Sequence, residues 1–228
     1  MAKSNKNIAA TEQSLNKQEA FFLKYRKQII TAIAAIIIII AGCIVYGTFI
    51  AGPREEKAST ALAKAQSLFE QGDFQKALNG DKQTEGFIAV IDNYGGTDAA
   101  NLAKAYAGLS YAQLGKWQEA VKYLEDFSTK DDAMISPAIT AALGDAYANT
   151  GNIDKAISSF KEAAEMADDA TKDGANYSLS PTFLIKAARL LESQGKKDDA
   201  LKIYEEIKKK YMVSAAAQEI DKYIERLK

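Results

Sequence analysis

A glycine recurs at the centre of four similar segments of this chain, and this repetition constrains the fold more than any other feature. The third segment reads Gly144, Tyr147, Gly151, Ile153, Ala156, Phe160, Ala163, and the second has the same spacings in Gly108, Tyr111, Gly115, Trp117, Ala120, Leu124, Phe127. Two segments keep the frame less completely: Ala65, Leu68, Gly72, Phe74, Ala77, and Ala188, Leu191, Gly195, Ala200, Tyr204, Ile207. Apolar residues three and four positions apart on both sides of each glycine indicate two helices joined by a tight turn.

Each recurring position has a physical reason. Gly108 and Gly144 let the first helix of a pair approach the second closely. A glycine between two helices instead favours a left-handed backbone, which glycine adopts without the steric penalty of a β-carbon. Aromatic residues such as Tyr147 fill the space between successive units. Asp73 and Asn152, each directly after a glycine, are predicted to cap the second helix.

The intervals between the four central glycines are 43, 36 and 44 residues, so the repetition contains insertions. One insertion is predicted within the second helix of the first repeat, around residues 79–84. Another, at residues 168–177, lengthens the link to the fourth repeat, whose first helix is expected to begin near Pro181. Residues 214–228 have apolar positions at helical spacing and predict a terminal helix that covers the last repeat.

The repeated unit closely resembles the tetratricopeptide repeat, a helix-turn-helix unit of about 34 residues. The resemblance covers about residues 55–210, with Lys197 where an aromatic residue is usual. It implies an all-α solenoid of about four repeats over residues 58–212 and a capping helix over 213–228. It also implies that the first helices line a concave groove, formed by Leu62, Gln66, Phe69, Leu102, Ala105, Leu109, Gln113, Ala141, Asp145, Asn149, Ile185 and Arg189.

A membrane helix is predicted over residues 28–52, which carry no charge. Its apolar stretch from Ile29 to Ile50 would span about 33 Å as a helix, enough for a hydrocarbon core of about 30 Å. Residues 1–27 form a basic tail with six basic and two acidic residues, and residues 53–57 form a short linker. The positive-inside bias places the amino terminus in the cytoplasm and everything after Pro53 outside it.

Cys43 allows a second interpretation of this segment. Ile40, Ala41, Gly42 and Cys43 have the form of a bacterial lipobox, preceded by basic and apolar residues as in a secretory signal. Cleavage there would leave Cys43 as a lipidated amino terminus on a peripheral protein. Apolar residues continue to Ile50, however, where a lipoprotein normally begins a polar tether, so the intact anchor is favoured.

The composition excludes several functions. The chain has no His and one Cys, so it offers no His-dependent catalytic triad, no His-ligated metal and no intrachain disulfide. A net charge of -1 gives no basic footprint for nucleic acid. The glycine-rich segment at residues 93–97 lacks the Lys of a phosphate loop and predicts a turn. Paired aspartates at residues 131–132, 168–169 and 198–199 are expected to cap helices or face solvent rather than bind calcium. We therefore expect a protein that is not an enzyme and has no cofactor or small-molecule substrate.

Binding of proteins is the function that remains. The predicted groove is mostly small or apolar, which suits an apolar helix or extended segment of a client polypeptide. It is unlike the Lys- and Asn-based carboxylate clamp of some tetratricopeptide co-chaperones. The alternative is that the insertion in the first repeat covers the apolar residues of that repeat.

The organisation as a whole is similar to that of the ancillary subunit of the bacterial Sec translocon, the YfgM-like proteins. That resemblance implies a single-pass inner-membrane protein whose repeats lie in the periplasm, beside the translocon and periplasmic chaperones. Two alternatives remain open: an envelope-assembly lipoprotein like the solenoid subunits of outer-membrane barrel assembly machinery, lipidated at Cys43, and a mitochondrial import receptor whose repeats face the cytosol.

Overall fold

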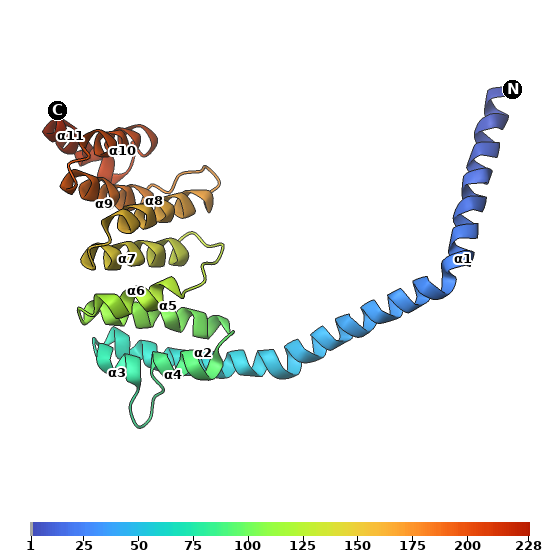
Figure 1. Cartoon of the computed structure of the whole chain (residues 1–228), viewed down its shortest axis with the longest axis horizontal. Helices are drawn as coiled ribbons and strands as arrows, with labels where there is room; N and C mark the ends of the chain where they lie inside the picture. The colour runs from blue at the N-terminus through green and yellow to red at the C-terminus, as the bar shows by residue number, and fades with distance from the viewer. Residues whose placement is uncertain (1) are drawn as a thin grey trace. The chain divides into compact units, whose positions relative to one another are not determined.

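The computed structural model describes residues 2–228, and the side chains of residues 21–228. Over this part of the chain every regular element is a helix, as the sequence predicts. The chain divides into two compact units, residues 1–54 and residues 55–228, shown with their elements in Figure 1.

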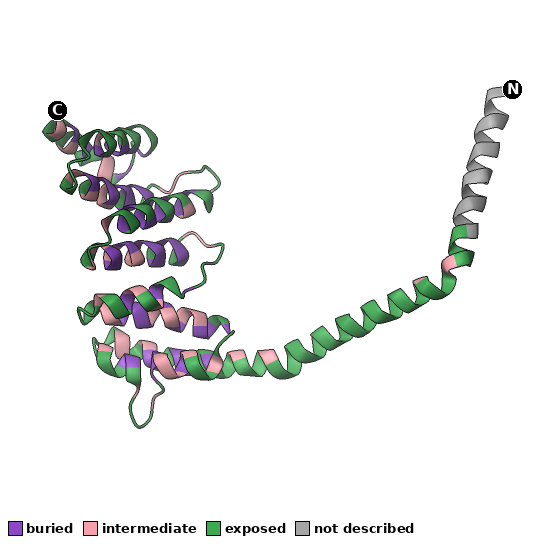
Figure 2. Cartoon of the chain, viewed as in Figure 1, coloured by how far each residue is buried: buried purple, intermediate pink, exposed green. Residues whose placement is uncertain are grey.

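The first unit is a long helix. Helix α1 (Ala2–Tyr46) is followed by a π-helical turn, η1 (Gly47–Ala51), and by the start of α2 (Gly52–Glu70). In the described part of the chain, one helical run, residues 21–70, is long and apolar enough to cross a membrane by length and composition. Its isoleucine side chains from Ile30 to Ile50 are exposed, as Figure 2 shows by colour. The predicted linker at 53–57 is helical and lies within α2.

Pro53 gives a physical reason for the π turn. A proline has no N–H to donate to the carbonyl of Phe49, four residues earlier, and its ring would clash with that carbonyl in a regular α-helix. In the structure the N–H of Gly52 donates to the carbonyl of Gly47, five residues back. The wider turn keeps the helix continuous past the proline.

The second unit is a stack of helix pairs (Figure 1). Helix α2 pairs with two short helices, α3 (Phe74–Asn79) and α4 (Phe87–Tyr94). The next pairs are α5 (Asp98–Gln113) with α6 (Trp117–Glu125) and α7 (Ile135–Asn149) with α8 (Ile153–Asp169). The last are α9 (Ser180–Ser193) and α10 (Lys197–Lys210), followed by α11 (Ala215–Leu227).

All four central glycines have the predicted left-handed backbone, with φ of +82° at Gly72, +72° at Gly115, +80° at Gly151 and +74° at Gly195. The residue after each glycine donates its N–H to the carbonyl five positions earlier, for example Lys116 to Tyr111 at 2.9 Å and Asn152 to Tyr147 at 2.9 Å. This is the bond of a Schellman motif. The two helices of each repeat are therefore joined by the same type of turn.

The predicted close approaches are also present. A β-carbon added at Gly108 would lie 2.5 Å from Cγ of Leu124, and one added at Gly144 would lie 3.0 Å from the ring of Phe160. In the second and third repeats the paired helices thus meet at a glycine, with little or no room for a β-carbon. Both insertions occur where the sequence predicts them, because residues 80–86 separate α3 from α4 and residues 170–179 link α8 to α9. Helix α11 buries Ile220 and Ile224 in the core of the last repeats and forms the predicted cap.

The predicted caps at Asp73 and Asn152 are wrong. Both residues occupy N-cap positions, but neither side chain accepts a bond from the helix. Their ψ angles are 54° and 62°, whereas Thr97 and Ser214, whose side chains do cap helices, have the extended ψ of 157° and 152°. The Schellman turn before each helix keeps Asp73 and Asn152 away from the extended ψ that capping requires, so their side chains do not accept from the N–H groups of the helix. Asp73 instead pairs with Lys76 at 2.8 Å.

Candidate functional site

The candidate site is the surface formed by the first helices of the repeats, α2, α5, α7 and α9, which we call the first-helix surface. All twelve residues predicted for a groove lie on these four helices. They differ in exposure. Gln113, Asn149 and Arg189 are exposed, and six are half-buried, namely Gln66, Phe69, Leu102, Leu109, Asp145 and Ile185.

Three residues of the predicted binding surface are buried and do not belong to it: Leu62, Ala105 and Ala141. They occupy the same register position in three successive repeats and are only 5%, 1% and 3% exposed. Each lies in a core cluster of buried residues, so none can contact a partner without a change in the packing. The sequence places them on the correct helix, but it does not reveal that neighbouring helices close over this position.

In the first repeat, Phe69 is covered by aromatic neighbours. Its ring centroid lies 5.2 Å from that of Phe74, 6.4 Å from Phe87 and 5.3 Å from Tyr106. Phe87 is fully buried at the start of α4, directly after the inserted segment. The helix that follows the insertion and the next repeat therefore cover this residue, so that the apolar part of the first-helix surface is centred on α5, with Leu102 and Leu109.

The charged residues of the third and fourth repeats are engaged with each other. Nζ of Lys186 donates to the carboxylate of Asp145 at 2.6 and 2.9 Å, and joins α9 to α7. Arg189 lies with its guanidinium 5.6 Å from the ring centroid of Tyr223 on α11. Glu192 accepts two bonds of 2.8 Å from Arg226. The carboxylates of Asp145 and Glu192 are therefore compensated by cations of the protein itself.

These pairings between helices could not be predicted from the sequence. Lys186 and Glu192 lie next to predicted groove residues in the same helix, but their partners come from another repeat or from the capping helix. Tyr223 and Arg226 are near the end of the chain, and only the packing of α11 on α9 and α10 brings them to this surface. No local spacing in the sequence signals that contact.

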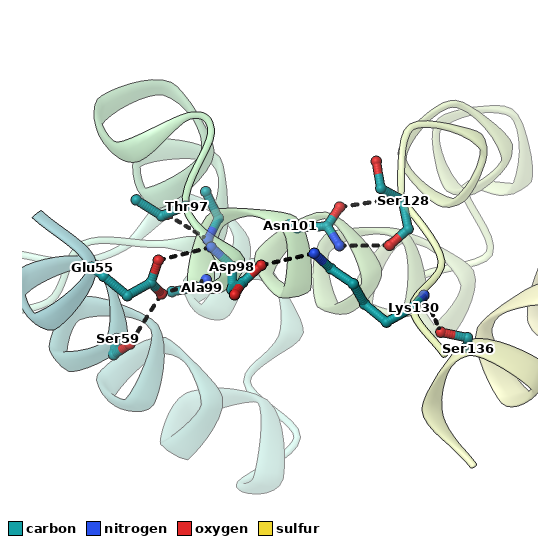
Figure 3. A network of polar contacts seen from close by, with 10 residues as sticks. Glu55, Ser59, Thr97, Asp98, Ala99, Asn101, Ser128, Lys130 and Ser136 are labelled. Atoms are coloured by element: carbon teal, nitrogen blue, oxygen red, sulfur yellow. Dashed lines mark hydrogen bonds and ion pairs between the residues drawn. The ribbon is translucent and has the colours of Figure 1, made fainter. Parts of the chain in front are cut away.

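A polar network holds the amino-terminal ends of α2, α5 and α7 in place (Figure 3). The carboxylate of Glu55 accepts from the N–H groups of Asp98 and Ala99 at 2.8 and 2.9 Å, and so caps α5 from the preceding repeat. On the other side, Asn101 exchanges two bonds with the backbone of Ser128, at 2.7 and 2.8 Å. Lys130 reaches Asp98 at 2.9 Å. These contacts fix the spacing of successive first helices.

Asp132 caps α7, as the sequence predicts for a carboxylate at a helix end. It accepts from the N–H groups of Met134, Ile135 and Ser136 and from the Ser136 hydroxyl. Burial alone would raise the pKa of Asp132, but these bonds outweigh it and lower the pKa below its usual value.

Asp168 corrects the expectation that the paired aspartates are solvated. Its side chain is buried where α8, α9 and the end of α10 meet. It accepts from the Ser180 and Tyr211 hydroxyls and from Nζ of Lys210, each at 2.5 Å, and from the N–H of Asn176 at 2.7 Å. Burial acts to raise the pKa of Asp168, but these donors lower it overall. Burial and the same carboxylate raise the pKa of Tyr211. This cluster ties the second insertion to the body of the repeats.

Within residues 21–228, no group of three or more Cys, Asp or Glu side chains is arranged to hold a metal ion. The carboxylates described above are committed to helix caps and ion pairs between repeats.

Comparison with known proteins confirms the repeats. The family model described as tetratricopeptide repeat matches residues 106–171 and 142–215. Two crystal structures of nearly identical TPR-like repeats, assigned to a kinesin light chain of Podosopora anserina, superpose with TM-scores of 0.56 and 0.57 at 14% identity. They cover 76% of this chain and 85% and 86% of their own chains. No curated protein matches the chain.

The chain thus contains tetratricopeptide repeats, and the fold of its neighbours extends beyond the part that the family model matches. Repeats of this kind form scaffolds for protein–protein interaction, and proteins of this fold are generally not enzymes. At 14% identity the solved structures support the fold alone. None of these comparisons supports the resemblance to the ancillary translocon subunit.

Proposed function

We propose that the protein is a membrane-anchored scaffold that binds polypeptides on its first-helix surface. The anchor is the apolar helix over residues 28–52, and the repeats lie on the periplasmic side of a bacterial inner membrane. The orientation rests on the three basic residues at positions 24, 26 and 27, directly before the apolar stretch, and on the mixed charges directly after it.

The observation that carries the binding proposal is the chemistry of the first-helix surface. Leu102 and Leu109 form a half-buried apolar centre on α5, flanked by the exposed amide of Gln113. Further along, Asp145 is neutralised by Lys186. A surface of this kind fits the apolar face of a helix, or an extended apolar segment, better than a charged tail. The partner class is therefore an apolar segment of an exported polypeptide or of a folding factor.

The proposed cellular context is the Sec translocon. A basic tail, one crossing and an exported repeat domain are the organisation of an ancillary Sec translocon subunit, which would pass emerging chains to periplasmic chaperones. Affinity capture of the full chain in mild detergent tests this context directly. Co-purification of the channel subunits would support it, whereas their absence under conditions that retain other membrane partners would contradict it.

The binding surface is tested by photo-crosslinking in cells. A photoreactive amino acid at Gln113 or Asn149, both exposed on the first-helix surface, should give client crosslinks. The same amino acid at Met212, which is 70% exposed in the turn between α10 and α11, is the matched control. In addition, L109E should weaken the crosslinks from Gln113 while circular dichroism shows that the helices persist. Equal crosslinking from Met212 and Gln113 would place the binding surface elsewhere.

The orientation has its own test. Protease added to the outside of spheroplasts should degrade the repeats and leave a small fragment that contains the basic tail and the crossing. Digestion of the repeats only from the cytosolic side would overturn the proposed topology and would favour an import-receptor arrangement.

A further inference from the structure

We propose that the segment of α1 at residues 23–35 is a binding site for one acidic phospholipid, which contacts the protein through both its phosphate and its acyl chains. The first observation is an open hollow along this stretch of the helix. It is lined by the cationic residues Lys24, Arg26 and Lys27 and, further along, by Ile30, Ala32 and Ala35. A cationic end and an apolar end in one hollow match the two ends of a phospholipid.

The cations of this hollow have no acidic residue beside them on its apolar side. Between residues 20 and 54 the chain has no Asp or Glu. Within the described side chains of that stretch, none of the three cations forms an ion pair; Lys24 lies over the ring of Tyr25 at 5.3 Å. Three cations on about one turn of helix therefore attract an anion, and Arg26 in particular can bind a phosphate through two donors.

Helix α1 bends shortly after residue 20, close to this hollow (Figure 2). The hydroxyl of Thr31 donates to the carbonyl of Lys27 at 2.9 Å, one turn earlier in the same helix. A hydroxyl bonded to the carbonyl four residues back often bends a helix. Both residues line the hollow, so the bond lies where the cationic part meets the apolar part.

The position of this segment specifies a lipid rather than a soluble phosphate. The apolar stretch begins at Ile29, two residues after Lys27, so the three cations lie at the depth of the headgroups if the helix crosses the membrane as proposed. Phe21, Phe22 and Tyr25 are aromatic residues of the kind that occupy this interface, and the rings of Phe21 and Tyr25 lie 4.8 Å apart. Each Lys or Arg near an anionic membrane surface strengthens the attraction about fivefold.

The test is native mass spectrometry of the full chain released from nanodiscs that contain phosphatidylcholine and phosphatidylglycerol in a 4:1 ratio. The wild-type protein should retain phosphatidylglycerol at least about fivefold above its share of the bilayer, and this preference should fall as salt is raised. K24Q/R26Q/K27Q should lose the preference. The matched control, K3Q/K6Q/K17Q, removes the same charge from the more distant part of the tail and should keep it, as should K24R/K27R.

Three outcomes would overturn the proposal. The triple variant could retain phosphatidylglycerol as the wild type does, the control could lose it equally, or millimolar inorganic phosphate could displace it, which would mean a site for free phosphate. Because the site depends on the proposed crossing, flotation of the same protein with neutral vesicles after a carbonate wash is measured in parallel. Failure to float would refute the crossing itself, whereas flotation without lipid preference would refute only the lipid site.

Discussion

At the scale of single residues, glycines do two different things in this protein. Gly108 and Gly144 provide space between paired helices, whereas Gly115 and its equivalents have a positive φ and end a helix. A substitution by alanine tests the two roles separately, because a β-carbon at Gly115 would meet no atom within 4 Å.

We expect G108A to be the most destabilising of the three alanine variants. The added carbon would lie 2.5 Å from a side-chain atom of Leu124 and 3.2 Å from its backbone nitrogen, so the two helices must separate, at a cost of about 1–3 kcal/mol. G144A should cost less, because the nearest atoms, 3.0 Å away, belong to a ring that can shift. G115A should cost about 1 kcal/mol through backbone strain. Thermal unfolding of the full chain in mild detergent, followed by circular dichroism, gives the order, and an equal effect of all three would contradict it.

Asp168 should make the stability of the protein depend on pH. Its folded pKa is lowered, so its contribution is fully present above the unfolded pKa of about 3.9 and is lost as the pH falls through the folded value. D168N should destabilise the protein by about 2 kcal/mol at pH 7, because the Lys210 contact loses its charge. The difference between wild type and D168N should then shrink below about pH 4. A difference that stays constant down to pH 2.5 would contradict this role.

At the scale of elements, the cap residues show what local sequence can and cannot predict. Thr97 and Asp73 both occupy N-cap positions, yet only the Thr97 hydroxyl accepts a bond from the helix, from the N–H of Ala100 at 3.0 Å. The difference lies in the turn before each helix, since the Schellman turn before α3 leaves Asp73 without the extended backbone that capping requires.

T97A should therefore destabilise the protein by about 1 kcal/mol, whereas D73A should change the stability by less than about 0.5 kcal/mol. The same full-chain unfolding measurement compares the two. Hydrogen exchange adds a local signal, because loss of the Thr97 cap should speed exchange at the start of α5 and leave α3 unchanged. Equal effects of the two variants would mean that N-cap position alone matters.

At the scale of the whole molecule, the repeat frame could be predicted from the sequence because its signals are local. Central glycines, small residues at close approaches and the insertions all appear as spacings along one segment. The charge compensation of the first-helix surface could not be predicted, because Asp145 meets Lys186, and Glu192 meets Arg226, across 41 and 34 residues. The burial of Ala105 likewise depends on how closely neighbouring helices pack.

The capping helix α11 should be required for the stability of the stack and should prevent its aggregation. Ile224 is 6% exposed in the core that α11 shares with α9 and α10, and the adjacent Tyr223 stacks on Tyr204 at 5.2 Å. I224D should cost about 3 kcal/mol or more, because it removes apolar burial and leaves a carboxylate without a partner, and should cause aggregation on heating. Q218D adds the same charge to an exposed position of α11 and should be neutral. Aggregation of both variants would point to charge rather than to the cap.

The last prediction concerns the end of the mature chain. In the structure the helix continues past Cys43 to Tyr46 and through the π turn to Ala51, so an apolar helix extends about two turns beyond the cysteine. Cleavage before Cys43 would divide this helix and leave a remnant too short to cross a membrane. We therefore expect intact-mass measurement of the membrane-extracted protein to show a chain that retains residues before Cys43 and carries no lipid on it. C43S should leave the mass otherwise unchanged and the protein in the membrane. A mature chain that begins at a diacylated Cys43, and that is lost in C43S, would replace the anchored scaffold with the lipoprotein.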